Sequence, residues 1–155
     1  MRVTVDTNVL VSAFISKNGI CAYVLDLTAT FDGITLVLSD EILAEFAEVM
    51  GRDEVRQRLG ARAKAAAEYE KAVRDIAEVV EVSSNFRVIK EDPDDNVFLN
   101  VGVDGKVEYI VSGDRHLKQL RRFKKIRIVS PKTFLGIVTR MFGDLVLSSS
   151  ESEPA

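Results

Sequence analysis

Short apolar runs alternate with segments of helical periodicity along most of the chain. Runs typical of buried strands cover residues 2–5, 34–38, 79–83, 108–112 and 126–130. Apolar residues at helical spacing between them predict helices over 9–14, 20–31, 41–50, 53–78, 97–103 and from 131 to about 141. A short basic helix is also expected after the turn at Gly113 and Asp114. The strands are continuous apolar runs, which is typical of a parallel sheet covered on both faces. The pattern therefore predicts an α/β fold with helices on both sides of the sheet.

Turn and cap residues set the boundaries of these elements. Ser39 and Asp40 are suited to cap the helix that begins at residue 41, and Gly51 is suited to end it. Gly60 interrupts the long segment 53–78, so this segment is expected to form a helical hairpin. No internal linker is found, and residues 1–147 are expected to form one domain. The polar tail 148–155 is expected to be disordered.

Composition narrows the class of protein. A chain of 155 residues with 46% hydrophobic residues can bury a core of its own. Its single cysteine, Cys21, excludes an intramolecular disulfide framework and a cysteine-rich zinc site. The net charge of −3 excludes a protein that is basic overall. Apolar runs are too short for a membrane span, and the N-terminus leads directly into a strand, so a cytoplasmic protein without a signal peptide is expected.

Two acidic residues directly follow predicted strands. Asp6 ends the first strand, and Asp114 follows the strand 108–112 after a short turn. In an open parallel sheet, ligands bind beyond the carboxyl ends of the strands, so both carboxylates face one crevice if these strands are neighbours. Neither residue has an obvious helix to cap, which makes a purely structural role hard to assign from the sequence.

Further acids can be placed near the same edge of the sheet. Glu45 lies at the border of the apolar stripe of helix 41–50, half-turned toward the sheet, whereas Glu41 and Glu48 point away from it. Asp92, Asp94 and Asp95 precede the helix at 97–103. Acids in the first turn of a helix stabilise it, so Asp94 and Asp95 can also be interpreted as caps. Glu45 alone can equally be a surface residue.

Four such acids in one crevice would need a counter-charge. Two like charges at 4 Å repel by about 4 kcal/mol at an effective dielectric near 20. Ionised carboxylates in a group must therefore bind protons or hold cations. Carboxylate oxygens without histidine or cysteine are typical ligands of Mg²⁺ or Mn²⁺, and such ions promote hydrolysis of phosphodiesters.

Four sequence motifs, in order, resemble those of the PIN-domain ribonucleases. They are DTNVLVSAF after the first strand, LAEF around Glu45, DPDDNVFLNVG, and YIVSGDRHL. The branch most similar to the chain is that of the toxins of toxin–antitoxin modules, with VapC-type toxins as relatives. The resemblance covers roughly residues 2–135. It implies a three-layer α/β/α sandwich with a parallel, five-stranded sheet, and Mg²⁺- or Mn²⁺-dependent cleavage of RNA.

The resemblance also implies roles for particular residues. The four acids of the family fall on Asp6, Glu45, Asp95 and Asp114, which would be catalytic and would hold one or two ions. Asp95 is favoured as the third acid because it stands seven residues before Gly102, where the family has a small residue; Asp92 and Asp94 stay open as alternatives. The residues expected to orient a carboxylate or a bound water are Asn8, Ser112, Asp92 and Asp94.

A run of basic residues begins directly after Asp114. It contains no acid, and its members are Arg115, Lys118, Arg121, Arg122, Lys124, Lys125 and Arg127. In a chain that is net acidic, such segregation can supply phosphate contacts beside the proposed metal site, so the residues up to Lys125 are candidates for RNA binding. A solvated basic helix and loop is the alternative.

The sequence thus favours a metal-dependent endoribonuclease, plausible as the toxin of a toxin–antitoxin pair. RNA would be its substrate, a small antitoxin protein its partner, and a homodimer is the expectation carried by the family. One alternative is a PIN-like domain that binds RNA or protein without cutting. A phosphotransfer receiver domain fits less well, because only Asp6 ends the first strand and Lys132 lies beyond Pro131. An EF-hand over DPDDN fails, because Val97 occupies the position that requires glycine.

Overall fold

A computed structural model describes the backbone of residues 1–151 and the side chains of residues 1–143. Over this part of the chain the backbone forms six strands: β1 (Arg2–Val5), β2 (Thr35–Leu38), β3 (Glu78–Val79), β4 (Tyr109–Val111), β5 (Arg122–Phe123) and β6 (Ile126–Val129). They join in one sheet of order β3-β2-β1-β4-β6-β5. All pairings are parallel except that of β5 with β6. The predicted α/β fold with a mostly parallel sheet is confirmed.

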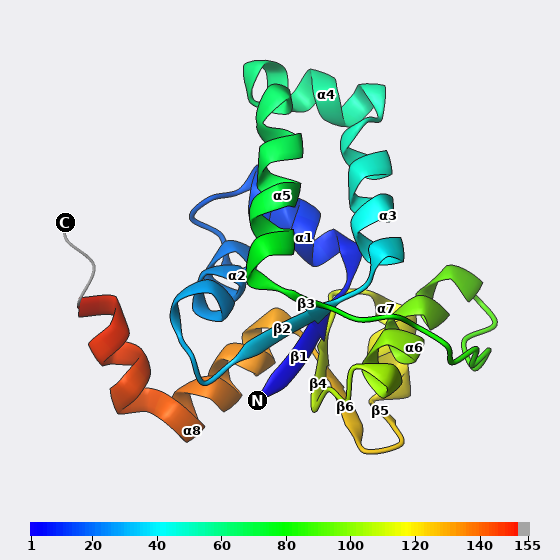
Figure 1. Ribbon diagram of the computed structural model, residues 1–155, viewed down its shortest axis with the longest axis vertical. Coiled ribbons are helices and arrows are strands. Elements are labelled where there is room, and N and C mark those ends of the chain that lie inside the picture. Colours follow the sequence, from blue (N-terminus) through cyan, green and yellow to red (C-terminus); the bar gives the residue numbers. More distant parts are fainter. Residues whose placement is uncertain (152–155) are drawn as a thin grey trace.

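Helices cover both faces of this sheet (Figure 1). They are α1 (Thr7–Ile15), α2 (Ile20–Thr30), α3 (Asp40–Met50), α4 (Asp53–Leu59), α5 (Ala66–Ile76), α6 (Asn96–Asp104), α7 (Arg115–Leu120) and α8 (Pro131–Glu151), with 3-10 helices at Gly60–Ala65 and Pro93–Asp95. α1 packs against α2, and α8 also packs against α2. α6 packs on β1, β2 and β4, and α7 packs on β6. α3, α4 and α5 form an arm that rises beyond the sheet in Figure 1.

The core lies on both sides of the central strands. Val3 and Val5 of β1 and Ile110 of β4 are fully buried, as continuous apolar strands predict. Gly102 lets α6 approach the sheet closely, because a Cβ atom there would come within 3.0 Å of the Ile126 side chain. A small residue at this position, as the resemblance implies, therefore fits the local packing.

Predicted boundaries differ from the observed ones at several places. The sheet has a sixth, antiparallel edge strand, β5, which is too short to leave a hydrophobic pattern. Of the strand predicted over 79–83, only the start lies in a sheet, since β3 is Glu78–Val79. α8 extends to Glu151, past the predicted end near Met141. The predicted tail 148–155 lies outside the described side chains, and 152–155 also outside the described backbone.

Among the described residues, no single helix has the length and apolar character needed to cross a bilayer. α1 and α2 reach that length only as a pair, with an angle of 101° between them.

Candidate metal centre

The strand order reverses direction between β1 and β4, and two of the predicted acids lie at this point. The two strands pair in parallel, with Val5 opposite Val111, and the Asp6 N–H donates to the Val111 carbonyl at 3.0 Å. Asp6 follows β1, and Asp114 follows β4 after Ser112 and Gly113. The expected neighbourhood of the two strands is confirmed. The crevice beyond the carboxyl ends at such a reversal is the usual ligand site of an α/β sheet.

Asp6 is almost fully buried and is held by the fold on both carboxylate oxygens. It is the N-cap of α1, where its Oδ1 accepts the N–H of Val9 at 2.8 Å. Its Oδ2 accepts a hydrogen bond from the Ser112 hydroxyl. Burial raises the pKa of Asp6, with a smaller contribution from the charge of Asp114, while the hydrogen bonds from Ser112 and Val9 oppose this rise.

Asp114 is half-buried and is the N-cap of α7. Its Oδ1 accepts the N–H groups of His116 at 2.8 Å and Leu117 at 3.1 Å. Burial works against its ionisation, but these backbone donors and a hydrogen bond from Asp95 outweigh burial and hold the pKa of Asp114 below its usual value. The expectation that Asp6 and Asp114 have no helix to cap was therefore wrong, because both are caps. Their ends of β1 and β4 lead directly into helices.

Ser112 connects these two acids. Its hydroxyl donates to Asp6 and accepts the backbone N–H of Asp114 at 2.9 Å. The side chain is fully buried, so one hydroxyl fixes the relative positions of the two strand ends. This is the kind of orienting contact that the sequence predicts for Ser112.

Asp95 differs from both capping acids. It ends the 3-10 helix Pro93–Asp95 and precedes α6, but its side chain makes no capping hydrogen bond there. It is buried, and its Oδ2 and Thr4 Oγ1 are the two buried polar side-chain atoms without a hydrogen-bond partner in the described part of the chain. Burial raises its pKa to about 8, aided by a hydrogen bond shared with Asp114 and by the charges of Asp114, Asp92 and Asp6.

Three carboxylates come together around Asp95. One oxygen each of Asp92, Asp95 and Asp114 lies within 4.8 Å of the other two. Asp92, for which an orienting role was expected, therefore belongs to the same cluster as Asp95 and Asp114. Asp6 joins the cluster through Ser112 and through its charge, which contributes to the raised pKa of Asp95.

Glu45 is held by Thr7, the residue next to Asp6, which the sequence analysis did not single out. The Thr7 hydroxyl donates to Glu45 Oε2 at 2.7 Å. Thr7 is buried at the start of α1, and α1 packs against α3. Glu45 is half-buried while Glu41 and Glu48 are exposed, as the helical periodicity predicts. No pattern in the sequence indicated Thr7, because its contact depends on how α1 and α3 pack.

Two other candidates lie at the surface. Asn8 is exposed, and its neighbour Thr7 makes the contact to an acid. Asp94 is exposed and lines a groove together with Glu45. Neither side chain has a hydrogen bond to Asp6, Asp95 or Asp114 among the contacts of the described residues.

The structure divides the basic run between the two ends of the sheet. Arg115 and Lys118 lie on α7, directly after Asp114 and at the acidic end. Lys124 and Lys125 lie in the turn that precedes β6, which is the opposite end because β6 runs parallel to β4. Arg121 and Arg122 lie between them, with Arg122 paired to Arg127 across β5 and β6. Lys124 Nζ lies 4.9 Å from the centre of the Phe86 ring.

Comparison with known proteins agrees with this geometry. The family description "PIN domain" matches residues 2–116, which include all the acids described above. The chain belongs to the PIN domain family. It is also 31% identical over 143 residues to the uncharacterized protein MJ1680 of Methanocaldococcus jannaschii, an alignment that covers 87% of this chain and 90% of that protein. Membership supports a nuclease-type fold, and the cluster of acids is consistent with the divalent metals typical of PIN domains.

The residues present fit a hard divalent cation. All the candidate donors are carboxylate oxygens, the preferred ligands of Mg²⁺ and Mn²⁺. The buried Asp95 Oδ2 has no partner within the described chain, and three carboxyl groups with oxygens within 4.8 Å of one another disfavour full ionisation. A bound cation would give this oxygen a partner and favour ionisation of the three groups.

Proposed function

We propose that this PIN-domain protein is a divalent-metal-dependent endoribonuclease. Asp95 and Asp114 would hold one or two Mg²⁺ or Mn²⁺ ions, with Asp6 and Glu45 completing the set of catalytic acids and Asp92 beside them. The observation that carries the proposal is the buried Asp95 oxygen without a partner, in a cluster of three carboxylates where the strand order reverses.

The residues around the proposed metal site each have a definable task in this reaction. When bound, the ion supplies positive charge that favours attack of water on the phosphodiester. Ser112 holds the Asp6 carboxylate, and Thr7 holds that of Glu45. The backbone N–H groups of α7 keep Asp114 ionised and ready to bind a cation. Asp95 must lose its proton before it can bind, because its pKa lies at about 8 in the metal-free protein.

Cleavage of single-stranded RNA with and without Mg²⁺ or Mn²⁺ tests the proposal. Asp95→Asn keeps the size of the side chain but removes its charge, and we expect it to lower the cleavage rate more than about 100-fold. Asp94→Asn is the matched control on the same 3-10 helix, because its side chain is exposed, and it should retain activity. Mn²⁺ should also raise the melting temperature of the parent and not that of Asp95→Asn.

A protein that neither cleaves RNA nor gains stability with Mn²⁺ would favour the alternative of a non-catalytic domain that binds RNA or protein. If Asp94→Asn lost as much activity as Asp95→Asn, the assignment of the third acid would be wrong.

The biological setting belongs to the same proposal. We infer a cytoplasmic toxin that a small antitoxin protein inhibits, with a homodimer as its expected state. Expression of the parent should then arrest growth, and Asp95→Asn should not. A gene for a small DNA-binding protein next to this one would support the pairing.

A further inference from the structure

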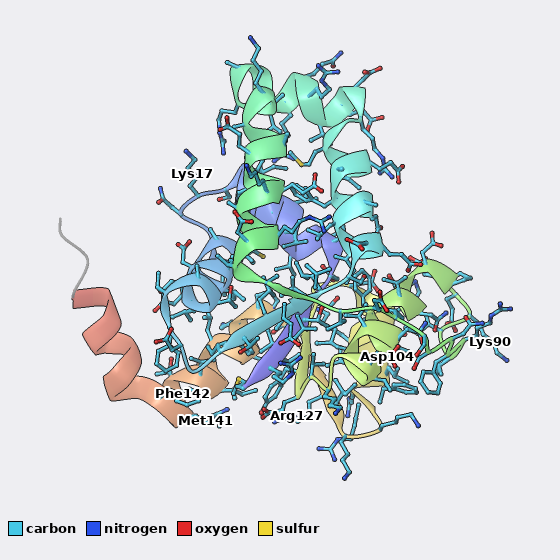
Figure 2. The ribbon with its side chains drawn as sticks, viewed as in Figure 1. Lys17, Lys90, Asp104, Arg127, Met141 and Phe142 are labelled. Carbon is cyan, nitrogen blue, oxygen red and sulfur yellow. The ribbon has the colours of Figure 1, made fainter. Side chains whose placement is uncertain are left out.

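An extended segment without helix or strand follows β3 and borders the acidic cluster. We call residues 83–90 of this segment the strap. Its backbone does not pair with the sheet, so its N–H groups need other partners. Figure 2 labels Lys90 on this segment, at the outer edge of the molecule, and Asp104 on α6 further inside.

Three polar side chains of α6 hold the strap. Asn96, Asn100 and Asp104 follow each other at intervals of four residues, and thus lie on one face of the helix. Asn96 Oδ1 accepts from Val88 and Ile89, Asn100 Oδ1 accepts from Phe86 at 2.7 Å, and Asp104 Oδ2 accepts from Ser83 and Ser84. In the sequence these three are short polar residues at helical spacing within an otherwise apolar helix. We assigned them no role from the sequence.

The strap is therefore fixed from α6, the helix that directly follows Asp95. The amide of Asn96 donates back to the carbonyls of Ile89 and Pro93, both at 2.9 Å. In the middle of the strap, Phe86 packs edge-on against Phe123 with 5.2 Å between ring centres. The strap backbone is preorganised, and its position is tied to that of the acidic cluster.

A groove of about 990 Å³ lies between the strap and α3. Its lining includes Glu45 and, from the segment around Asp95, Pro93, Asp94 and Asn96, so the groove runs past the stretch of chain that carries Asp92 and Asp95, although those two acids do not line it. Its two walls carry opposite charge: α3 contributes Glu41, Glu45 and Glu48, and the strap contributes Arg87 and Lys90.

Arg87 and Lys90 are available to a ligand. Both are exposed. Across the side chains described, neither forms an ion pair with an acid, whereas Arg52 on the opposite wall pairs with Glu48 at 3.2 Å. Two unpaired cations on a fixed backbone are suited to bind phosphate groups, and the glutamates of α3 exclude phosphates from the other wall.

We propose that this groove binds the single-stranded stretch of RNA next to the cleaved bond, with its phosphates on Arg87 and Lys90. The proposal rests on the nuclease function above and adds the path of the strand. The volume is that of a site for a small ligand and is sufficient for a few nucleotides of one strand. RNA would enter past the strap, and the basic residues of α7 would not determine its path.

The salt dependence of binding tests this path. A short fluorescein-labelled single-stranded RNA is titrated with protein in EDTA, which prevents cleavage, at several salt concentrations, and anisotropy is measured. Each phosphate contact on a single strand contributes about 0.7 to the slope of log affinity against log salt. Arg87→Gln with Lys90→Gln should therefore bind more weakly and reduce the slope by about 1.4. Arg87→Lys keeps the positive charge, so its slope should stay close to that of the parent.

Matched pairs decide between the possible paths. Lys17→Gln with Lys106→Gln removes two exposed charges that do not line the groove, and should leave the slope unchanged. Arg115→Gln with Lys118→Gln tests α7. A slope that falls only in the α7 pair, a parent that does not bind the RNA, or a duplex that competes as well as the single strand would each overturn the proposal.

The same variants separate the two proposals. A parent that binds the RNA through Arg87 and Lys90 but never cleaves it with Mg²⁺ or Mn²⁺ would refute the nuclease function and keep the groove. A parent that cleaves RNA while the strap pair binds it with an unchanged slope would refute the groove alone.

Discussion

The acids at the strand ends differ from Asp95 in what the chain itself supplies to their oxygens. Asp6 and Asp114 each accept backbone N–H groups from the helix that follows, and Asp6 also accepts the Ser112 hydroxyl. Asp95 makes no capping hydrogen bond and has one buried oxygen without a partner. The pKa values follow this difference for Asp114, which is lowered, and for Asp95, which is raised to about 8, whereas burial raises the pKa of Asp6 despite its hydrogen bonds.

The comparison suggests that different acids of one crevice serve different purposes. Some stabilise the fold, and another is available to bind a cation. An acid whose oxygens accept hydrogen bonds from the fold caps a helix or fixes a strand end, and so stabilises the fold. An acid with a free buried oxygen costs stability until something binds to it. We therefore expect Asp6 to be the acid on which folding depends most, and Asp95 the acid on which a cation has the largest effect.

Replacing these two acids by alanine gives the largest expected contrast. Asp6→Ala removes the cap of α1 and leaves the Val9 N–H and the Ser112 hydroxyl without their partner. Because a lost cap and an unsatisfied buried donor each cost about 1–2 kcal/mol, the free energy of unfolding should fall by about 2–4 kcal/mol. Asp95→Ala should change it by less than ~1 kcal/mol in metal-free buffer. Urea unfolding of both variants measures this.

Asp94→Ala is the control for this pair, because it removes an exposed aspartate of the same 3-10 helix. If Asp6→Ala and Asp95→Ala lowered the free energy of unfolding by similar amounts, the two acids would contribute equally to the fold. The proposed difference between them would then be wrong.

The pH dependence of stability should distinguish Asp95 from its neighbours. An unfolded aspartate loses its proton near pH 4, whereas folded Asp95 keeps it up to about pH 8. Between these values the folded state binds the extra proton, so Asp95 makes the metal-free protein less stable as pH rises from about 4 to about 8. The amide that Asp95→Asn introduces does not titrate and can still donate to Asp114. The melting temperature of this variant should therefore gain on that of the parent across the same range.

Above about pH 8, the difference between Asp95→Asn and the parent should become constant. Asp94→Asn should follow the parent at every pH. A difference between Asp95→Asn and the parent that stays the same from pH 4 to 8 would contradict the raised pKa.

Most strands and helices could be predicted from the sequence, because the spacing of hydrophobic residues reflects which side chains are buried. The capping roles of Asp6 and Asp114 could not, and the reason differs between them. The predicted helix began at residue 9, whereas α1 begins at Thr7, directly after Asp6. This shift of two residues, common at helix ends, concealed the cap. At Asp114 the helix was expected, but the site was interpreted only as a turn.

Contacts between segments far apart in the chain could not be predicted from the sequence either. Asp92 reaches the cluster because Pro93–Asp95 forms a 3-10 turn, which a count of residues to Gly102 does not reveal. The strand predicted over 79–83 is apolar enough to pair with the sheet, but the N–H of Ser83 binds Asp104 instead. Side chains of α6 thus determine where this strand stops, and with it the wall of the groove.

Glu45 belongs with the acids that the fold engages, and it offers the smallest expected effect. Thr7→Val replaces the hydroxyl by a methyl group of similar size, so packing between α1 and α3 is retained while the hydrogen bond to Glu45 is lost. The free energy of unfolding should fall by about 1 kcal/mol, the usual contribution of one such bond. Glu45 would then sample more orientations, and cleavage should slow by about 10-fold or less. Thr7→Ser, which keeps the hydroxyl, should restore most of the rate although it loses the methyl group. If Thr7→Val and Thr7→Ser cleaved RNA equally well, Thr7 would only fill space between the helices.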